Sequence, residues 1–468
     1  MGQIVPWRTE LLLGGEVNTK PPHAIGLSEA ASAVNLDPRA YTGAKTRNGR
    51  ETFAGTNGSG FAVNGIKAWQ RNAGTSYLLY KTTTAFWSAS AGGTASIGSG
   101  GTASALMSAV PLDDVMVVVA DGLTPQKWPA SSDLTNLGGS PPAEAKYAVV
   151  YVSKVFLAGN DAAPQTFYFS ATNNAEQYDS SVAVNDAGSV TSQEGGGDTI
   201  QGLRSCRKWM CIFYRYYTEI LVGNTVFNFA VDKLTDHGLV SQTGHCGTGD
   251  VAFFASDEAV WMVAGARATD ITTAKMRTWY QGISDKSKIT LGLKGDLLLV
   301  IDYGTGTAYA CDYKTGRWDC WTDQYWRCLD TSNDQTLYAG PSASTVQIWK
   351  LDTGSTDSAS AISAYWRTGG WDFGVPEVKK NLAGFFVHAK MSMPTTTLTW
   401  YMDGVAAAST KDVTYSATTE GDWKLAGPKA GRANFWSFKV AWSGPGTLYG
   451  LCAYGEVTSV DGGPPNES

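Results

Sequence analysis

Short apolar runs separated by turn residues recur along most of the chain. From about residue 65, strand-like runs such as Tyr77–Lys81, Val115–Ala120 and Thr166–Ser170 follow one another at a spacing of roughly 8 to 12 residues. Gly, Pro, Asn and Asp stand between the runs, and these are the residues that tight turns favour. This rhythm predicts an all-β protein with a sandwich, barrel or propeller architecture.

A longer repeat runs through the middle of the chain, between Lys146 and about Lys350. Groups of strands recur there at a period of roughly 40 to 50 residues, without one shared signature. Most groups contain an apolar strand, a turn with Gly, Asn or Asp, and a second strand with an aromatic residue. Because a propeller blade is a small sheet that needs neighbours on both faces, such a repeat predicts a β-propeller.

The segment from Cys311 to Trp321 predicts one hairpin in particular. Two strands flank a turn that ends at Gly316, which can supply a positive φ angle. Trp318 and Trp321 then lie in the following strand, where large rings can fill the space between blades. The hairpin resembles those of kelch-type blades.

The two ends of the chain differ from the middle. The first 53 residues carry turn and extended-chain markers, such as Pro21-Pro22 and Asp37-Pro38, with little alternation. Beyond a polar linker near residue 355, alternating strands and turns return, which is typical of a small sandwich. A stretch of small residues, 92–101, predicts a loop or an edge strand. The predicted division is an extended N-terminal arm (1–53), a β-propeller (54–355), a β-sandwich-like segment (356–460) and a disordered tail (461–468).

Composition supports the all-β prediction and limits the classes of partner that the protein can bind. Charged residues make up 17% of the chain, whereas Gly (53), Trp (17) and Tyr (21) are abundant. The net charge of -6 provides no positive field for binding nucleic acid. We therefore expect double-stranded DNA to pass the protein without being bound tightly. The sequence contains neither a signal-peptide pattern nor a run of about 18 apolar residues. We therefore expect synthesis in a cytoplasm and no membrane insertion.

Metal and cofactor sites are not predicted. The seven cysteines do not show the two-residue spacing of zinc knuckles, so reduced, buried thiols are expected instead of disulfides. His23, His237, His245 and His388 are mostly far apart in sequence, and only His245 stands beside a cysteine. We interpret these histidines as surface or hydrogen-bonded residues and predict no metal and no cofactor.

Catalytic motifs are fragmentary. Ser205-Cys-Arg-Lys208 and Lys314-Thr-Gly316 match parts of the penicillin-recognising serine enzymes, but they fall in a predicted strand pair and a hairpin turn. A propeller glycosidase would need two carboxylates at a set separation. For the available carboxylates we favour roles in turns, and we predict no catalytic residues; these carboxylates are Asp113, Asp114, Asp257, Glu258 and Asp302.

Aromatic residues gather in the C-terminal segment. Packing in a core or between subunits is the favoured interpretation, and an aromatic platform that stacks on sugars is the alternative. The residues concerned are Tyr365, Trp366, Trp371, Trp400, Trp423, Trp436 and Trp442.

Several phrases, taken in order, resemble a family of phage tail structural proteins that includes the nozzle proteins of short-tailed phages. The small-residue insert at 92–104 departs from that pattern. The phrases are Gly14-Gly15-Glu-Val-Asn18, Pro22–Asn35, Arg47-Asn-Gly49, Val149–Ser170, Asp312–Trp321, Leu337-Tyr-Ala-Gly340 and Arg367–Gly374.

The resemblance implies a propeller body in a homo-oligomeric ring, usually a hexamer, at the end of a short tail. Its partners would be tail adaptor and tube proteins, with tail fibres as a further partner, and DNA would pass through without being processed. The location implied is the tail of the virion, after synthesis in the host cytoplasm. The N-terminal arm is predicted to cross to a neighbouring subunit or to the adaptor. The alternatives are a receptor- or glycan-binding module and, more distantly, a propeller glycoside hydrolase.

Overall fold

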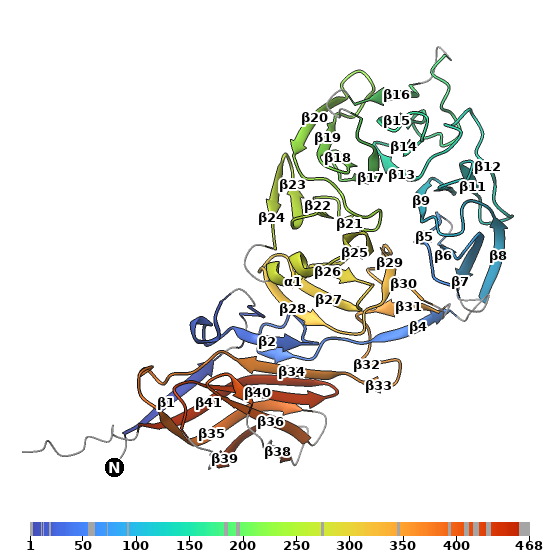
Figure 1. Ribbon diagram of the computed structural model, residues 1–468. Coiled ribbons are helices and arrows are strands. Elements are labelled where there is room, and N and C mark those ends of the chain that lie inside the picture. The colour runs from blue at the N-terminus through green and yellow to red at the C-terminus, as the bar shows by residue number, and fades with distance from the viewer. Residues whose placement is uncertain are drawn as a thin grey trace, which may run out of the picture.

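The protein is an almost entirely β structure with a propeller above and a two-sheet sandwich below, joined by the N-terminal segment (Figure 1). The one α-helix in the described part of the chain is α1 (Arg277–Gly282), which lies between the fifth and sixth blades. The computed structural model describes residues 3–10, 12, 14–17, 20–54, 61–72, 74–90, 93–181, 186–192, 197–272, 276–343, 347–391, 395–406, 411–414, 421–426 and 432–457.

The first five blades are four-stranded antiparallel sheets built from consecutive strands. Apolar residues on both faces of each blade pack against the neighbouring blades, as the repeat predicts. The strands are β5 (Ile66–Gln70), β6 (Ser76–Lys81), β7 (Ala85–Ser90) and β8 (Gly93–Ser99); β9 (Met107–Leu112), β10 (Val115–Ala120), β11 (Gln126–Trp128) and β12 (Thr135–Asn136); β13 (Tyr147–Tyr151), β14 (Lys154–Ala158), β15 (Thr166–Phe169) and β16 (Gly188–Thr191); β17 (Ile200–Ser205), β18 (Trp209–Tyr214), β19 (Thr218–Val222) and β20 (Ala230–Thr235); β21 (His245–Gly247), β22 (Val251–Ala255), β23 (Val260–Ala264) and β24 (Arg267–Asp270).

Two further blades close the ring. The inner strand of every blade contacts the inner strand of the next, and β29 of the seventh blade contacts β5 of the first. The fourth strand of the seventh blade comes from the N-terminal segment, because β4 (Arg50–Ala54) pairs antiparallel with β31. The propeller is therefore seven-bladed. The remaining strands are β25 (Ile289–Lys294), β26 (Leu297–Asp302), β27 (Thr307–Asp312) and β28 (Arg317–Trp321), then β29 (Trp326–Thr331), β30 (Leu337–Pro341) and β31 (Ile348–Leu351).

The sandwich consists of two sheets with an aromatic core that includes Trp366, Trp371, Phe385, Trp436 and Phe438. One sheet contains β1 (Gln3–Glu10), β3 (Ala44–Lys45), β35 (Lys380–Met391), β39 (Gly421–Ala426) and β41 (Gly446–Val457). The other contains β2 (Ala30–Val34), β34 (Ser363–Thr368), β36 (Thr395–Met402), β37 (Val405–Ala406), β38 (Lys411–Thr414) and β40 (Trp436–Ser443). A short hairpin of β32 (Thr356–Asp357) and β33 (Ser360–Ala361) lies between the two units.

Strand β2 joins the two units directly. It pairs antiparallel with β34 of the sandwich, and its residue Val34 pairs in parallel with Cys320 of β28. The sixth blade and one sheet of the sandwich are thereby one continuous ten-stranded sheet. Such a sheet resists bending at the boundary because backbone hydrogen bonds cross it.

The predicted all-β propeller is confirmed, and the predicted hairpin is present between β27 and β28. Gly316 has a φ of 71°, and both Trp318 and Trp321 are buried. The small-residue stretch supplies β8, the outer strand of the first blade, for residues 93–99, while residues 91 and 92 lie outside the described part. The tail at 461–468 also lies outside the described residues.

The N-terminal segment is extended but does not stand apart as an arm. Its strands all pair with strands of the same chain: β1 and β3 pair in the sandwich, β2 in both units and β4 in the propeller. The physical reason is that unpaired strand edges leave backbone N–H and C=O groups without partners. The propeller consequently takes its last strand from residues 50–54, ahead of the predicted boundary.

Candidate functional site

The carboxylates that the sequence singled out lie in turns of different blades. Asp113 has a φ of 52° in the β9–β10 turn, and Asp114 accepts a hydrogen bond from the Asn72 N–H at 3.1 Å. Asp257 and Glu258 lie between β22 and β23. Asp302 ends β26 and accepts hydrogen bonds from the Gly304 N–H at 2.9 Å and the Thr305 hydroxyl at 2.8 Å. The structure does not bring these residues together into the carboxylate pair that glycoside hydrolysis requires.

The fragments of the serine-enzyme motif are also separated. Ser205 ends β17 and Lys208 precedes β18, both in the fourth blade. Lys314 lies in the β27–β28 turn of the sixth blade and pairs with Asp296 at 2.9 Å. A shared nucleophile and base is therefore not formed by these residues.

Three of the four histidines lie on aromatic neighbours away from the propeller axis. The rings of His23 and Phe435 are 5.7 Å apart, His237 stacks on Trp261 at 4.1 Å, and His388 lies 5.1 Å from Tyr449. His245 differs, because it is the first residue of the inner strand β21 and lines a cavity on the axis.

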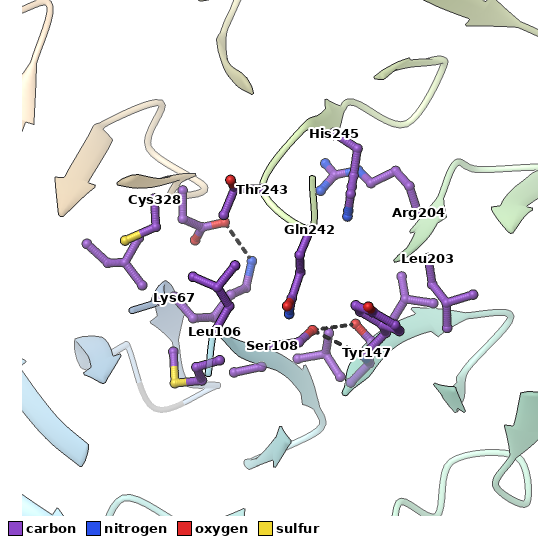
Figure 2. Close-up of a pocket in the computed structure, with 18 of the residues that line it drawn as sticks. Lys67, Leu106, Ser108, Tyr147, Leu203, Arg204, Gln242, Thr243, His245 and Cys328 are labelled. Carbon is purple, nitrogen blue, oxygen red and sulfur yellow. Dashed lines mark hydrogen bonds and ion pairs between the residues drawn. The ribbon is translucent and has the colours of Figure 1, made fainter. Parts of the chain in front are cut away.

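The axial cavity is the concave site inside the propeller (Figure 2). Its volume is about 160 Å³, and a second cavity of about 120 Å³ shares part of its wall. Inner strands of all seven blades contribute to the walls. The residues common to both cavities are Lys67, Arg204, His245, Leu291, Leu329 and Asp330.

Lys67 and Asp330 form an ion pair across the point where the propeller ring closes. The Lys67 Nζ atom lies 2.9 Å from Asp330 Oδ1, and the other carboxylate oxygen accepts the Ala68 N–H at 2.8 Å. Because Lys67 is on β5 and Asp330 is on β29, this pair links the first blade to the seventh. It balances the charge of both groups inside the cavity.

Arg204 and His245 occupy the opposite part of the shared wall (Figure 2). The Arg204 Nη2 atom donates to the Gly247 carbonyl, whereas the buried Arg204 Nε and His245 Nδ1 atoms have no hydrogen-bond partner in the described structure. Burial, together with the nearby Arg204 charge, lowers the pKa of His245 to about 3. The imidazole is therefore neutral at neutral pH. Sequence reasoning missed Arg204, because its place on the axis depends on closure of the whole ring.

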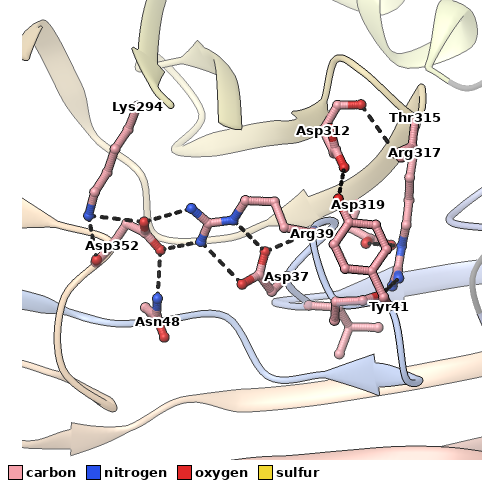
Figure 3. A network of polar contacts seen from close by, with 12 residues as sticks. Asp37, Arg39, Tyr41, Asn48, Lys294, Asp312, Thr315, Arg317, Asp319 and Asp352 are labelled. Carbon is pink, nitrogen blue, oxygen red and sulfur yellow. Dashed lines mark hydrogen bonds and ion pairs between the residues drawn. The ribbon is translucent and has the colours of Figure 1, made fainter. Parts of the chain in front are cut away.

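A network of buried charges lies at the junction between the propeller and the N-terminal segment (Figure 3). Arg39 donates to both oxygens of Asp352 and to both oxygens of Asp37. Lys294, at the end of β25, and Asn48 also donate to Asp352, at 3.0 and 2.9 Å. These donors hold the pKa of the Asp352 carboxyl below its usual value in spite of burial.

Beside this network, the segment around Glu16 packs against β28. The Glu16 N–H donates to the Trp318 carbonyl at 2.9 Å, and Arg317 bonds Asp319 at 3.0 Å. Glu16 is buried, and its Oε2 atom has no hydrogen-bond partner among the described residues. Burial, with the nearby charge of Asp319, raises the pKa of Glu16 to about 8.

The C-terminal tryptophans are core residues. Tyr365 is half-buried beneath the Lys439 ammonium, which lies 3.9 Å from the ring centre. The side chain of Trp423 lies outside the described residues. Buried side chains are found at Trp366, Trp371, Trp400, Trp436 and Trp442.

An aromatic groove lies instead on the outer face of the sheet that contains β35 and β41. Its volume is about 640 Å³, and Phe386, His388, Tyr449 and Tyr454 line it. Phe386 packs edge-on against Tyr454 at 5.6 Å. The signal that could have found it is the period-2 placement of Phe386 and His388 on one strand face.

Metal and disulfide chemistry find no support in the described residues. No group of three His, Cys, Asp or Glu side chains there is arranged to hold a metal ion. All seven cysteines are free thiols. Within the same residues, no helix has the length and apolar character needed to cross a bilayer.

Comparisons with known proteins do not assign a family. No protein-family model and no curated protein match the chain. The chain is similar in structure to the extracellular domain of a hybrid two-component system from B. thetaiotaomicron (TM-score 0.47, 10% identity), over 67% of this chain and 40% of that one. Similarity also extends to a streptogramin B lyase (TM-score 0.45, 8% identity, 65% and 97% covered) and to a virginiamycin B lyase from Staphylococcus aureus (TM-score 0.43, 9% identity, 64% and 98% covered). At these TM-scores the likenesses say nothing about the function of this chain.

Proposed function

We propose that this protein is a structural, non-catalytic subunit of a tailed-phage tail, which assembles into a ring of the nozzle type through which double-stranded DNA passes. The proposal is supported by the position, in the structure, of the residues on which the family resemblance rests. Several of these phrases, although distant in sequence, meet at the junction of the propeller and the sandwich.

The Gly14-Gly15 phrase permits close approach of the N-terminal segment to the sixth blade. A Cβ atom on Gly15, which has a φ of 70°, would lie 2.8 Å from the Trp318 carbonyl oxygen. Trp318 belongs to the Asp312–Trp321 phrase, so two of the family-like phrases are in direct backbone contact. Only glycine fits such an approach without a shift of the backbone.

Residues of two other motifs also make polar contacts at the junction. Asn35 donates to the Thr322 hydroxyl at 3.1 Å and to the Ser363 carbonyl at 2.8 Å, which joins the propeller to the sandwich. Arg47 makes a bidentate ion pair with Asp357, with contacts of 2.6 and 3.1 Å. Paired units of one chain usually move relative to each other unless their interface is extensive. These contacts favour a rigid two-part wall, which a ring subunit needs.

The charge of the chain is compatible with a DNA conduit. A net charge of -6 repels the phosphate backbone, and a wall that does not bind the duplex lets it slide. The Arg39 and Arg47 guanidinium groups at the junction are paired with carboxylates and are not offered to phosphate.

The test is the assembly state of the purified full-length chain. We expect ring-shaped particles in negative-stain images and a light-scattering mass six times that of the 49.8 kDa chain. A protein that stays monomeric at every concentration, and that is missing from purified virions, would contradict the proposal. Deletion of residues 1–50 is not a clean test, because it removes strands β1, β2 and β3 from the sandwich.

The aromatic groove favours a second candidate, a virion receptor- or glycan-binding role for the sandwich. Aromatic faces beside hydroxyl and imidazole groups suit sugar rings. On a glycan array probed with the full-length protein, binding that Phe386→Ala and Tyr454→Ala abolish would support this role. Phe227→Ala, which changes a 96% exposed ring on the fourth blade, is the matched control. If neither the wild type nor any of the three variants binds a glycan, ring formation remains the one proposed function.

A further inference from the structure

Two positive charges lie opposite each other on neighbouring strands of the sandwich. Arg367 of β34 and Lys439 of β40 are partners in the antiparallel pairing. The residues next to them, Trp366 and Val440, belong to the core, so the two charged side chains are on the other face of the sheet. Like charges at opposed positions destabilise a sheet. This opposed cation pair (Arg367 and Lys439) is therefore unfavourable for the fold on its own.

Each member of the opposed cation pair is held over a tyrosine ring. The Arg367 Cζ atom lies 3.6 Å from the centre of the Tyr401 ring, and its Nε donates to the Ser437 hydroxyl at 3.2 Å. The Lys439 Nζ atom lies 3.9 Å from the centre of the Tyr365 ring. Among the described residues, neither cation has a carboxylate partner. The rings fix the positions of the two charges but do not neutralise them.

The charged groups of the pair are within reach of a ligand from solution. Both side chains are half-buried, and those of their nitrogen atoms that have no hydrogen-bond partner remain accessible to solvent. Burial, with the nearby charge of Arg367, lowers the pKa of Lys439. A negatively charged group that binds here would relieve both effects.

Lys439 also lines a cleft between the sandwich and the propeller. Its volume is about 720 Å³, within the range of roughly 300 to 1,000 Å³ that is usual for pockets of small ligands. Strands β2, β4, β34, β36 and β40 and the β32–β33 hairpin contribute to its walls. The cleft is thus large enough for a small molecule and too small for a DNA duplex.

The other charged groups of the cleft are close to charges of the opposite sign. Asp357 pairs with Arg47 at 2.6 Å. Arg50 donates to the Asp323 carbonyl oxygen at 2.8 Å and lies in the field of the Asp357 and Asp323 carboxylates. The excess positive charge is therefore at the opposed cation pair, and two carboxylates elsewhere in the cleft disfavour a ligand with many negative charges.

Three serine hydroxyls complete the cleft. Ser360, Ser363 and Ser443 line it, and within the described part of the chain their hydroxyls make no hydrogen bond. Ser363 and Ser443 are opposite each other on the same two strands and the same face as the opposed cation pair. One negative group and several hydroxyls on a single small ligand would match these partners.

We propose that this cleft binds a sugar that carries a carboxylate, of the uronate class. The carboxylate lies at the opposed cation pair, and the ring hydroxyls bond the three serines. This site is separate from the aromatic groove, which is on the other sheet of the sandwich. It does not depend on ring assembly, because one chain contains all of its residues.

The experiment is a saturation-transfer NMR titration of the full-length protein with D-glucuronate, at pH 7 and constant ionic strength. We expect a saturable signal with glucuronate and none with D-glucose, which has the same ring without the carboxylate. Lys439→Gln is expected to weaken glucuronate binding by about tenfold or more. Lys390→Gln makes the same change at an exposed position of β35, in the other sheet, and is expected to bind as the wild type does.

The other results would overturn the proposal. These are no saturable signal with glucuronate, a saturable signal with glucose, or equal affinity in Lys439→Gln and the wild type. Displacement of glucuronate by an equal concentration of acetate or phosphate would also contradict it, because the hydroxyls would then contribute nothing. If Lys439→Gln does not fold, Arg367→Gln removes the other charge and is expected to weaken binding in the same way. Phe386→Ala should leave glucuronate binding unchanged, and its loss there would assign the sugar to the aromatic groove instead.

Discussion

Arg39 and Asp352 stand 313 positions apart in the chain and are joined by two parallel hydrogen bonds of 2.7 and 3.0 Å (Figure 3). Asp352 directly follows β31, the third strand of the seventh blade, and has a φ of 54°. Because Lys294 and Asn48 also donate to it, Asp352 joins the sixth blade, the seventh blade and the N-terminal segment at one point. Charge pairing therefore adds to apolar packing in holding the junction together.

The first prediction concerns that pair. Arg39→Gln leaves the buried Asp352 carboxylate with fewer donors, so we expect the free energy of unfolding to fall by about 3 kcal/mol. Urea unfolding followed by tryptophan fluorescence measures the change. Arg267→Gln, at an exposed position on β24, is the control and should lie within about 0.5 kcal/mol of the wild type. Equal stability of the two variants would show that the junction network contributes nothing.

The second prediction is a pH dependence that arises from Glu16. Its pKa is about 8 in the folded protein and about 4.3 in an unfolded chain, so the folded state keeps a proton that the unfolded state loses. Stability is therefore expected to fall as pH rises from about 4.5 to about 8, and to change no further from this group above that. Unfolding free energies at pH 5 and pH 8 measure the effect.

Glu16→Gln is the matched variant, because it keeps the shape and removes the titration. Its stability should lose this part of the slope and exceed that of the wild type at pH 8. A slope that is identical in both proteins would assign the pH dependence to other groups.

The third prediction tests the packing of Gly49, one residue before β4, against the β32–β33 hairpin. A Cβ atom there would lie 1.9 Å from the Thr356 carbonyl oxygen and 2.4 Å from the carbonyl carbon. Backbone atoms cannot move aside as a flexible side chain does, so Gly49→Ala is expected to lower Tm by several degrees or to prevent folding. Gly282→Ala, at a position with nothing within 4 Å, is the control. A Gly49→Ala protein with unchanged Tm would contradict this close approach of Gly49 to Thr356.

The fourth prediction compares two tryptophans in the sandwich core. Trp436 Nε1 donates to the Lys380 carbonyl at 3.1 Å, whereas Trp366 Nε1 has no hydrogen-bond partner among the described residues. Both side chains are fully buried, so replacement by Phe removes similar volume at each site. Trp436→Phe is therefore expected to cost about 1 kcal/mol more than Trp366→Phe. The reverse order in urea unfolding would contradict this.

The local sequence pattern was enough to predict the propeller and one of its hairpins. The turn before Gly316 and the strand that carries Trp318 and Trp321 are determined by residues next to each other in sequence. Blade number was not predictable in the same way. The seventh blade needs Arg50–Ala54, a short run with one large apolar residue, and nothing local relates that run to β31.

The candidate sites show the same limit. Arg204 was not singled out from the sequence, because its place is set by the strands of other blades that complete the axis. The C-terminal tryptophans were correctly favoured as core residues, because large rings on alternating positions are normally buried. The groove at Phe386 and Tyr454 was missed, since the two residues lie far apart in sequence and only the pairing of β35 with β41 brings them together.

The pairing of β1 with β41 has a consequence for synthesis on the ribosome. Thr9 bonds Leu451, 442 positions later. Strand β1 therefore leaves the ribosomal exit tunnel long before its partner β41 has been synthesised. At bacterial to eukaryotic elongation rates of about 5 to 20 residues per second, that wait is roughly 20 to 90 s. The propeller can close on β4 during this time, while β1 and β2 remain open edges that could pair with other nascent chains. This topology therefore favours protection of the nascent N-terminal strands until β41 has been made.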